Sequence, residues 1–159
     1  MDSKKELYQF IEKQKERRKF AKNASPQMQQ QSLKLSSLIQ SQGSIFWNRL
    51  LKRLESTLNA LHEIDFAGSA SPFGEDIMRV VVNSRSVKTI HSWTDLVRDG
   101  DRIRCSVLNG GIYYLDFVAI SDSEIALQDT QLHGDPMDEG KTAVYVIERM
   151  VNIIERALG

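Results

Sequence analysis

The segment closest to a known catalytic motif spans residues 134–142 and ends in Gly-Lys-Thr. A P-loop has four residues between its first glycine and this triplet, and its backbone amides hold nucleotide phosphates. Here five residues intervene, and three of them are the acids Asp135, Asp138 and Glu139, which would repel phosphates. We therefore expect no nucleotide. We predict instead that Asp138 or a neighbouring acid caps a C-terminal helix and favours the positive end of its dipole.

Metal ligation needs several converging side chains, and the three histidines His62, His91 and His133 form no such pattern. None stands four residues from another, and none lies beside a pair of cysteines. Asp129, His133 and Asp135 fall within one short segment, which a solvated loop explains as well as a metal site does. The sequence therefore predicts neither a bound metal nor a cofactor.

The single cysteine, Cys105, occupies an inward position of an alternating segment, so it is better interpreted as a core residue than as a catalytic nucleophile. The chain also lacks the Gly-x-Ser-x-Gly sequence of serine hydrolases. An enzymatic activity has no support in these residues, although they do not exclude it. A binding function is the better interpretation.

The composition is that of a globular protein, with 41% apolar and 26% charged residues. The chain contains no run of about 18 apolar residues, which a membrane span requires, and it begins without an apolar signal core. A lone cysteine forms no internal disulfide, which fits a reducing compartment. We expect a cytoplasmic protein with no membrane partner.

Charge is unevenly distributed, although the formal net charge is zero. Residues 1–62 contain 12 Lys and Arg against 5 Asp and Glu, whereas the remainder contains 9 against 16. Six basic residues crowd a predicted N-terminal helix, and such a cluster can neutralise phosphates. Interleaved glutamates make a solvated helix face the simpler interpretation. The alternative hypothesis is a nucleic-acid-associated accessory protein that uses Lys13, Lys15, Arg17, Arg18, Lys19 and Lys22.

Strong helix formers without glycine or proline predict a helix from Ser3 to about Lys22. A segment rich in Gln and Ser follows, in which Ser25 can cap a second, marginal helix that ends at Gly43. Leucines and aromatic residues then recur at three- and four-residue steps over residues 46–61, which predicts a core helix.

After a small-residue loop at 67–74 the apolar period becomes that of strands. Asn109-Gly110 predicts a type I′ hairpin turn, and short turns join antiparallel neighbours. Five strands are predicted, at residues 77–82, 87–93, 102–108, 112–120 and 124–128. The predicted fold is therefore α+β. It consists of an N-terminal helical arm over residues 1–43, basic and then rich in Gln and Ser, and a compact domain over residues 44–159. In that domain an antiparallel β-meander of about five strands packs against a central and a C-terminal amphipathic helix.

The final helix, from about Glu139 to Leu158, is apolar over more than half its circumference, so it needs a second surface besides the sheet. Arm helices with half an apolar stripe become ordered on a partner. The best-supported hypothesis is a protein–protein interaction or assembly module that forms a homo-oligomer or binds another protein. A third hypothesis is a small-molecule binder or enzyme with a pocket between helices and sheet. The residues expected to contact the partner are Leu7, Phe10, Ile11, Leu35, Leu38, Ile39, Val146, Met150 and Ile153.

Overall fold

The computed structural model describes the backbone of residues 2–22, 26–87 and 89–159, and the side chains of residues 4–15, 29–87 and 89–159. The chain divides into two compact units, residues 1–35 and 36–159, which are described separately. In chain order the elements are α1 (Asp2–Lys22), α2 (Pro26–Ala60), the 3₁₀ helix η1 (Leu61–Ile64), β1 (Phe66–Pro72), β2 (Ile77–Ser84), β3 (His91–Asp99), β4 (Arg102–Val107), β5 (Gly111–Ala119), β6 (Ile125–Gln128) and α3 (Glu139–Leu158).

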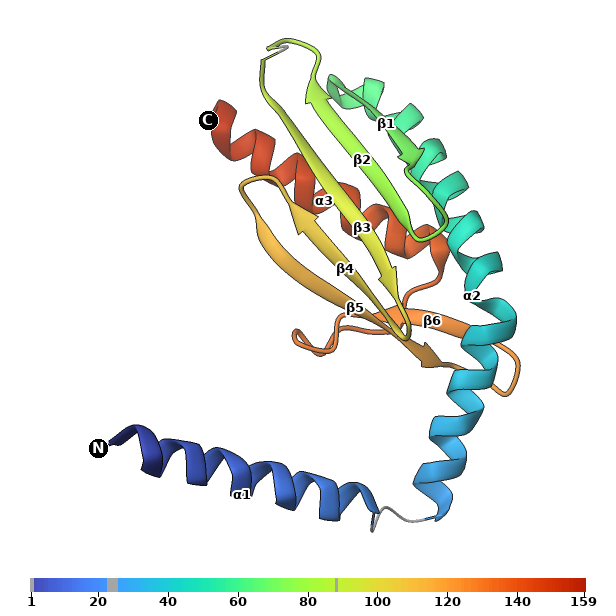
Figure 1. The fold of residues 1–159 in the computed structure, drawn as a ribbon. Helices are drawn as coiled ribbons and strands as arrows, with labels where there is room; N and C mark the ends of the chain where they lie inside the picture. The colour runs from blue at the N-terminus through green and yellow to red at the C-terminus, as the bar shows by residue number, and fades with distance from the viewer. Residues whose placement is uncertain (1, 23–25, 88) are drawn as a thin grey trace. The chain divides into compact units, whose positions relative to one another are not determined.

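The second unit is built on an antiparallel sheet whose six strands lie in the order in which they occur in the chain (Figure 1). Each strand therefore pairs with its neighbour in sequence, as short connections require. α3 crosses one face of this sheet behind β2 and β3, and the later part of α2 runs beside β1 (Figure 1). The predicted α+β meander with a central and a C-terminal helix is thus confirmed, with six strands instead of about five.

Side chains alternate between a buried and an open face of the sheet. In β4 the predicted inward residues Ile103, Cys105 and Val107 are all buried. On α2 the predicted core stripe is buried too, and α3 buries an arc that includes Ile147 and Ile154. A strand presents successive side chains to opposite faces, so the core lies between the sheet and the two helices.

β1 replaces the small-residue loop that the sequence suggested. Its small residues are needed because α2 and β2 approach this edge strand closely. A Cβ atom on Gly68 would lie 2.3 Å from the carbonyl oxygen of Val81 and 2.7 Å from Leu58 Cδ2. Composition alone reads such a segment as a loop, but here it pairs along the whole length of β2.

β3 begins and ends later than the predicted strand at 87–93, and it includes residues that the sequence assigned to a loop. The inward residues of this strand include Ser92 and Thr94, both 0% exposed. Their hydroxyl groups find no hydrogen-bond partner among the described groups. Two polar residues at inward positions interrupt the apolar alternation, which explains the shifted prediction.

α2 is one continuous helix, so the predicted helix end at Gly43 and the new start at Ser44 are wrong. Gly43 lies inside the helix, where a Cβ atom would be 3.3 Å from the guanidinium nitrogen Nη1 of Arg98. Arg98 also donates hydrogen bonds to the Ser44 hydroxyl at 3.4 Å. The glycine therefore admits an arginine from β3 instead of ending the helix. Ser25, the other predicted cap, lies outside the described residues.

The β4–β5 hairpin is confirmed, but its turn differs from the predicted type I′. Positive φ occurs at Asn109 (61°) and Gly111 (75°), while Gly110 donates its amide to the Val107 carbonyl at 3.1 Å. A Cβ atom on Gly110 would lie 2.7 Å from Ile153 Cδ1. This glycine is thus required by the close approach of α3, not by a left-handed backbone.

α3 begins where the sequence predicted. The carboxylate of Asp138 accepts a hydrogen bond from the Lys141 amide at 2.8 Å, and the helix runs from Glu139. Asp138 is therefore the N-cap, which accounts for an acid in the segment that resembles a P-loop.

Candidate binding groove

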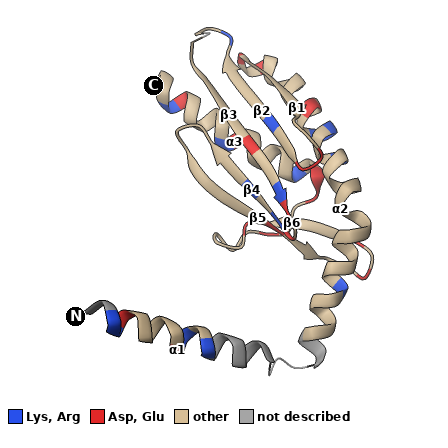
Figure 2. Cartoon of the chain, in the orientation of Figure 1, with Lys and Arg blue, Asp and Glu red and all other residues tan. Residues whose placement is uncertain are grey.

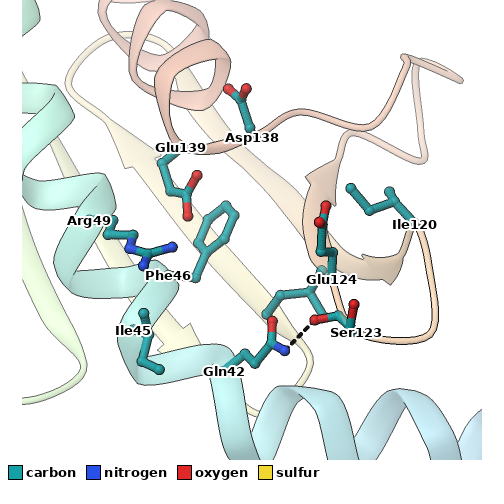
Figure 3. Close-up of a pocket in the computed structure, with 10 residues that line it drawn as sticks. Gln42, Ile45, Phe46, Arg49, Ile120, Ser123, Glu124, Asp138 and Glu139 are labelled. Carbon is teal, nitrogen blue, oxygen red and sulfur yellow. Dashed lines mark hydrogen bonds between the residues drawn. The ribbon is translucent and has the colours of Figure 1, made fainter.

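A cavity of about 590 Å³ in the second unit lies between α2, the β5–β6 turn and the start of α3 (Figure 3). Figure 3 shows Arg49 and Glu139 reaching toward the ring of Phe46, while Ile120 and Glu124 lie across the opening. The cavity is an open groove on the protein surface, of the kind that accepts part of a larger ligand.

The floor of the groove is apolar. Phe46 is 3% exposed and packs edge-on against Phe117, with the ring centroids 5.6 Å apart. On the rim, Ile45 and Ile120 are 50% and 49% exposed. Two exposed isoleucines above a buried aromatic ring form an apolar surface that water covers at a cost in free energy.

Charged side chains surround this apolar floor. Arg49, Glu124 and Glu139 form no side-chain hydrogen bond or ion pair with any described residue. The carboxylate of Asp138 caps α3 and points away from the groove (Figure 3). Both charge signs are therefore available to a ligand on the groove walls.

A second cavity of about 480 Å³ adjoins the first and shares Arg49 and Glu139 with it. It adds Lys52, Arg53 and Ser56 on the exposed side of α2. The two cavities follow α2 from Gln42 to Ser56, a distance of about 21 Å at 1.5 Å per helical residue. The groove is acidic near the β5–β6 turn and basic farther along α2.

Contacts between α2 and the sheet fix the walls of the groove. The side-chain amide of Gln42 donates to the Ser123 carbonyl in the β5–β6 turn. Arg98 pairs with Asp76 at 2.9 Å and stacks on Trp47, 5.8 Å from its centroid. The groove is held on regular elements, so its shape is present before a ligand binds.

Of the predicted contact residues, Leu7, Phe10 and Ile11 lie on α1 and are 57%, 59% and 38% exposed. They stand at i, i+3 and i+4, so they share one face of the helix. On α2, Leu38 is buried, and Leu35 and Ile39 are half-buried. The three predicted contact residues of α1 are therefore exposed, whereas those of α2 are wholly or partly buried within the chain.

On α3 the structure places Val146 and Met150 at 0% exposure, and Ile153 is half-buried. The sheet covers the apolar arc of this helix that the sequence assigned to a second surface. Val144 and Leu158 of the same helix are 50% and 44% exposed. Because Val146 and Met150 belong to the core of the chain itself, they offer no surface to a partner.

The basic residues of the nucleic-acid hypothesis are only partly described. Lys13 and Lys15 are exposed, and Lys15 lies 3.9 Å from Glu12. The side chains of Arg17, Arg18, Lys19 and Lys22 lie outside the described residues.

The open face of the sheet carries arginines that already have partners. Arg79 donates two hydrogen bonds to Asp95, at 2.7 and 2.9 Å, and stacks 4.7 Å from the Trp93 centroid. Arg79 and Asp95 stand opposite each other in the pairing of β2 with β3, and Figure 2 shows basic and acidic positions on these two strands. Arg102 is paired in the same way with Asp116 at 3.0 Å. Pairing neutralises these two arginines, whereas Arg104 on the same face of β4 is exposed and has no partner among the described residues.

A buried polar network connects α3 with the end of β6. Asp129 is 4% exposed and accepts hydrogen bonds from the Tyr145 hydroxyl at 2.5 Å and from the Leu132 amide at 3.2 Å. Arg149 donates to the same tyrosine oxygen at 3.0 Å. Burial, together with the bond to Asp129, raises the pKa of Tyr145.

The metal site considered for Asp129, His133 and Asp135 is not formed. Asp129 is buried and its carboxylate bonds to Tyr145 and Leu132 in the interior. Within the described residues no group of three or more potential ligands forms a metal site.

Cys105 is a core residue, and burial raises the pKa of its thiol to about 12. An unfolded thiol titrates near 8.5. From about pH 9 upward the unfolded chain therefore loses this proton while the folded chain keeps it, so the free energy of unfolding falls as the pH rises.

We expect slow labelling of the native Cys105 thiol by iodoacetamide. In urea titrations between about pH 8 and 10 we expect Cys105→Ala to lose less stability with pH than the unsubstituted protein. Equal pH slopes, or rapid native labelling, would contradict this.

The sequence identified the cap Asp138 but missed the groove. Its lining comes from three separate segments, and only the tertiary fold brings Ile45, Glu124 and Glu139 together. One signal was present: Ile45 is a large apolar residue that the predicted core stripe of the helix does not include.

Of the helices that the structure describes, none has the length and apolar character needed to cross a lipid bilayer. The chain matches no protein-family model, and no curated protein or solved structure is significantly similar to it.

Proposed function

We propose that this chain is a protein–protein interaction module that self-associates, and that its groove binds the N-terminal helix of a second copy. The observation that carries this proposal is an apolar groove floor with exposed isoleucine rims and charged walls that have no partner among the described residues. An amphipathic helix laid into a groove is a common mode of recognition, and it is anchored by apolar residues at i, i+3 and i+4.

α1 has the chemistry that such a groove requires. Leu7, Phe10 and Ile11 form an exposed apolar face on a helix of 21 residues. Lys4 and Lys15 continue this face by steps of three and four residues at its two ends, about 16 Å apart. The groove, about 21 Å long, accommodates that span.

Charge supports the same pairing at the end of the groove near the β5–β6 turn, where the acidic residues lie. Glu124 and Glu139 lie in the groove without a described partner, so each is available to a lysine of the incoming helix. Exposed ion pairs contribute little affinity, whereas they set orientation and association rate. The apolar contacts with Phe46, Ile45 and Ile120 would supply most of the binding free energy.

The test is the oligomeric state of purified protein, measured by light scattering and analytical ultracentrifugation over a range of concentrations. We expect Phe10→Asp to weaken self-association by about 30-fold or more, since an apolar anchor in a groove typically contributes at least about 2 kcal/mol. Ile120→Asp in the groove should have the same effect.

Two exposed positions provide matched controls. Gln9→Asp changes the same helix away from the apolar face, and Ile112→Asp changes an isoleucine of β5 that is 59% exposed and lies outside the groove. Neither control should alter self-association. A chain that stays monomeric at all concentrations would overturn the proposal, as would an oligomer that is insensitive to both Phe10→Asp and Ile120→Asp.

A further inference from the structure

A separate hollow of about 340 Å³ lies between the β4–β5 turn and the second half of α3. Its polar lining consists of Asn109, Arg149, Asn152 and Arg156. No carboxylate lines it. Two positive charges and two amides therefore meet around one small space, at a place distinct from the groove beside α2.

Arg149 is held in place by the polar network beneath it. Its guanidinium carbon lies 4.0 Å from the centroid of Tyr113, and its Nη1 donates to the Tyr145 hydroxyl at 3.0 Å. That hydroxyl donates in turn to Asp129 at 2.5 Å. One face of the guanidinium is thus stacked and one donor is used, which leaves its other donors free to bind a ligand in a fixed orientation.

The other polar groups are free to turn toward the hollow. Asn152 and Arg156 follow Arg149 by three and seven residues, so all three share one side of α3. None of the side chains of Asn109, Asn152 and Arg156 has a hydrogen bond or ion pair with any described residue. Their donors are therefore available to an acceptor that enters the hollow.

The apolar wall makes the hollow compact. Val107 and Ile153 line it together with Gly110, where a Cβ atom would lie 2.7 Å from Ile153 and 2.9 Å from Val107. Glycine at this position lets the turn approach α3. The resulting space is small and open to solvent, and these apolar side chains form one of its walls.

We propose that this hollow binds a phosphate group, as inorganic phosphate or as the terminal group of a phosphate monoester. Arginine forks match phosphate oxygens in geometry as well as in charge, and amide side chains add donors. The C-terminal end of α3 carries about half a negative charge, which the two guanidinium groups outweigh.

The first test is titration of the full chain with inorganic phosphate, followed by NMR of backbone and side-chain amides, with chloride at equal ionic strength as the reference. We expect saturable shifts at Asn109, Gly110 and Asn152, with a dissociation constant that is roughly millimolar. Arg156→Gln should weaken binding by about tenfold, because it removes a charge-assisted hydrogen bond. Arg85→Gln, at an exposed arginine of the β2–β3 connection, should leave the affinity unchanged.

Two further probes separate the sources of the phosphate group: glycerol phosphate in solution and vesicles that contain phosphatidate. Binding to the soluble monoester alone would assign the hollow to a small metabolite. Binding to the vesicles with equal sensitivity to Arg156→Gln would assign it to a lipid headgroup. The proposal fails if phosphate gives no saturable shifts, or if Arg156→Gln and Arg85→Gln weaken binding equally.

Discussion

Met150→Asp should unfold the chain or destabilise it by roughly 5 kcal/mol or more, which is comparable to the whole stability of a small domain. Met150 is 0% exposed on α3, where an aspartate would place an unpaired carboxylate in the core and leave a cavity behind. Urea unfolding followed by circular dichroism measures this loss. A stably folded Met150→Asp variant would show that this face of α3 is not core.

Val144→Asp is the matched control on the same helix. Val144 is 50% exposed, so the carboxylate stays in water, and we expect the free energy of unfolding to change by less than about 1 kcal/mol. A large loss at both positions would instead reflect a general effect of charge on α3.

Asp129→Ala has the second-largest expected effect, a loss of about 2 to 4 kcal/mol. The change leaves the Tyr145 hydroxyl and the Leu132 amide without their acceptor, and it removes the carboxylate to which Arg149 is linked through that hydroxyl. Unfolding by urea at neutral pH measures it. Asp135→Ala, at an exposed aspartate of the same loop, should cost less than about 0.5 kcal/mol. If the two alanine variants are equally stable, the network makes no net contribution to folding.

Most of the fold could be predicted from the sequence because local signals and burial agree. Leu50, Leu54 and Leu58 repeat at the helical period and are all buried. Asp138 stands before the final helix, and its side chain caps it. In such segments the apolar residues that recur at the period of the element are the same residues that pack in the core, so the period alone was sufficient to predict the element and its buried face.

Errors occurred where tertiary contacts override local preference. Gly43 has the local chemistry of a helix end, but Arg98 from a strand far along the chain occupies the space beside it. Gly68 belongs to a strand because Leu58 and Val81 approach too closely for a side chain. These partners lie ten or more residues away in sequence, so no local rule includes them.

The candidate site was less accessible to sequence reasoning than the fold. The exposed face of α1 was predicted from spacing, whereas the groove depends on Phe46, Glu124 and Glu139 meeting across three elements. On α3 the spacing indicated a surplus of apolar residues but not which of them the sheet would cover. Which arc of an apolar helix is buried depends on its rotation against the sheet, and sequence spacing does not fix that rotation.

Both edge strands of the sheet carry features that hinder the addition of a further strand. Along the outer edge of β6, the amide and carbonyl of Leu127 are bonded to Met137 at 2.9 and 2.7 Å, so part of that edge is already occupied. The opposite edge strand, β1, ends in Pro72, which has no amide hydrogen to offer. Open edges recruit further strands and lead to fibrils. In the proposed association of helix and groove the blunted edges stay outside the interface, and unfolding of β1 or of the Met137 segment would expose an edge that can start cross-β assembly.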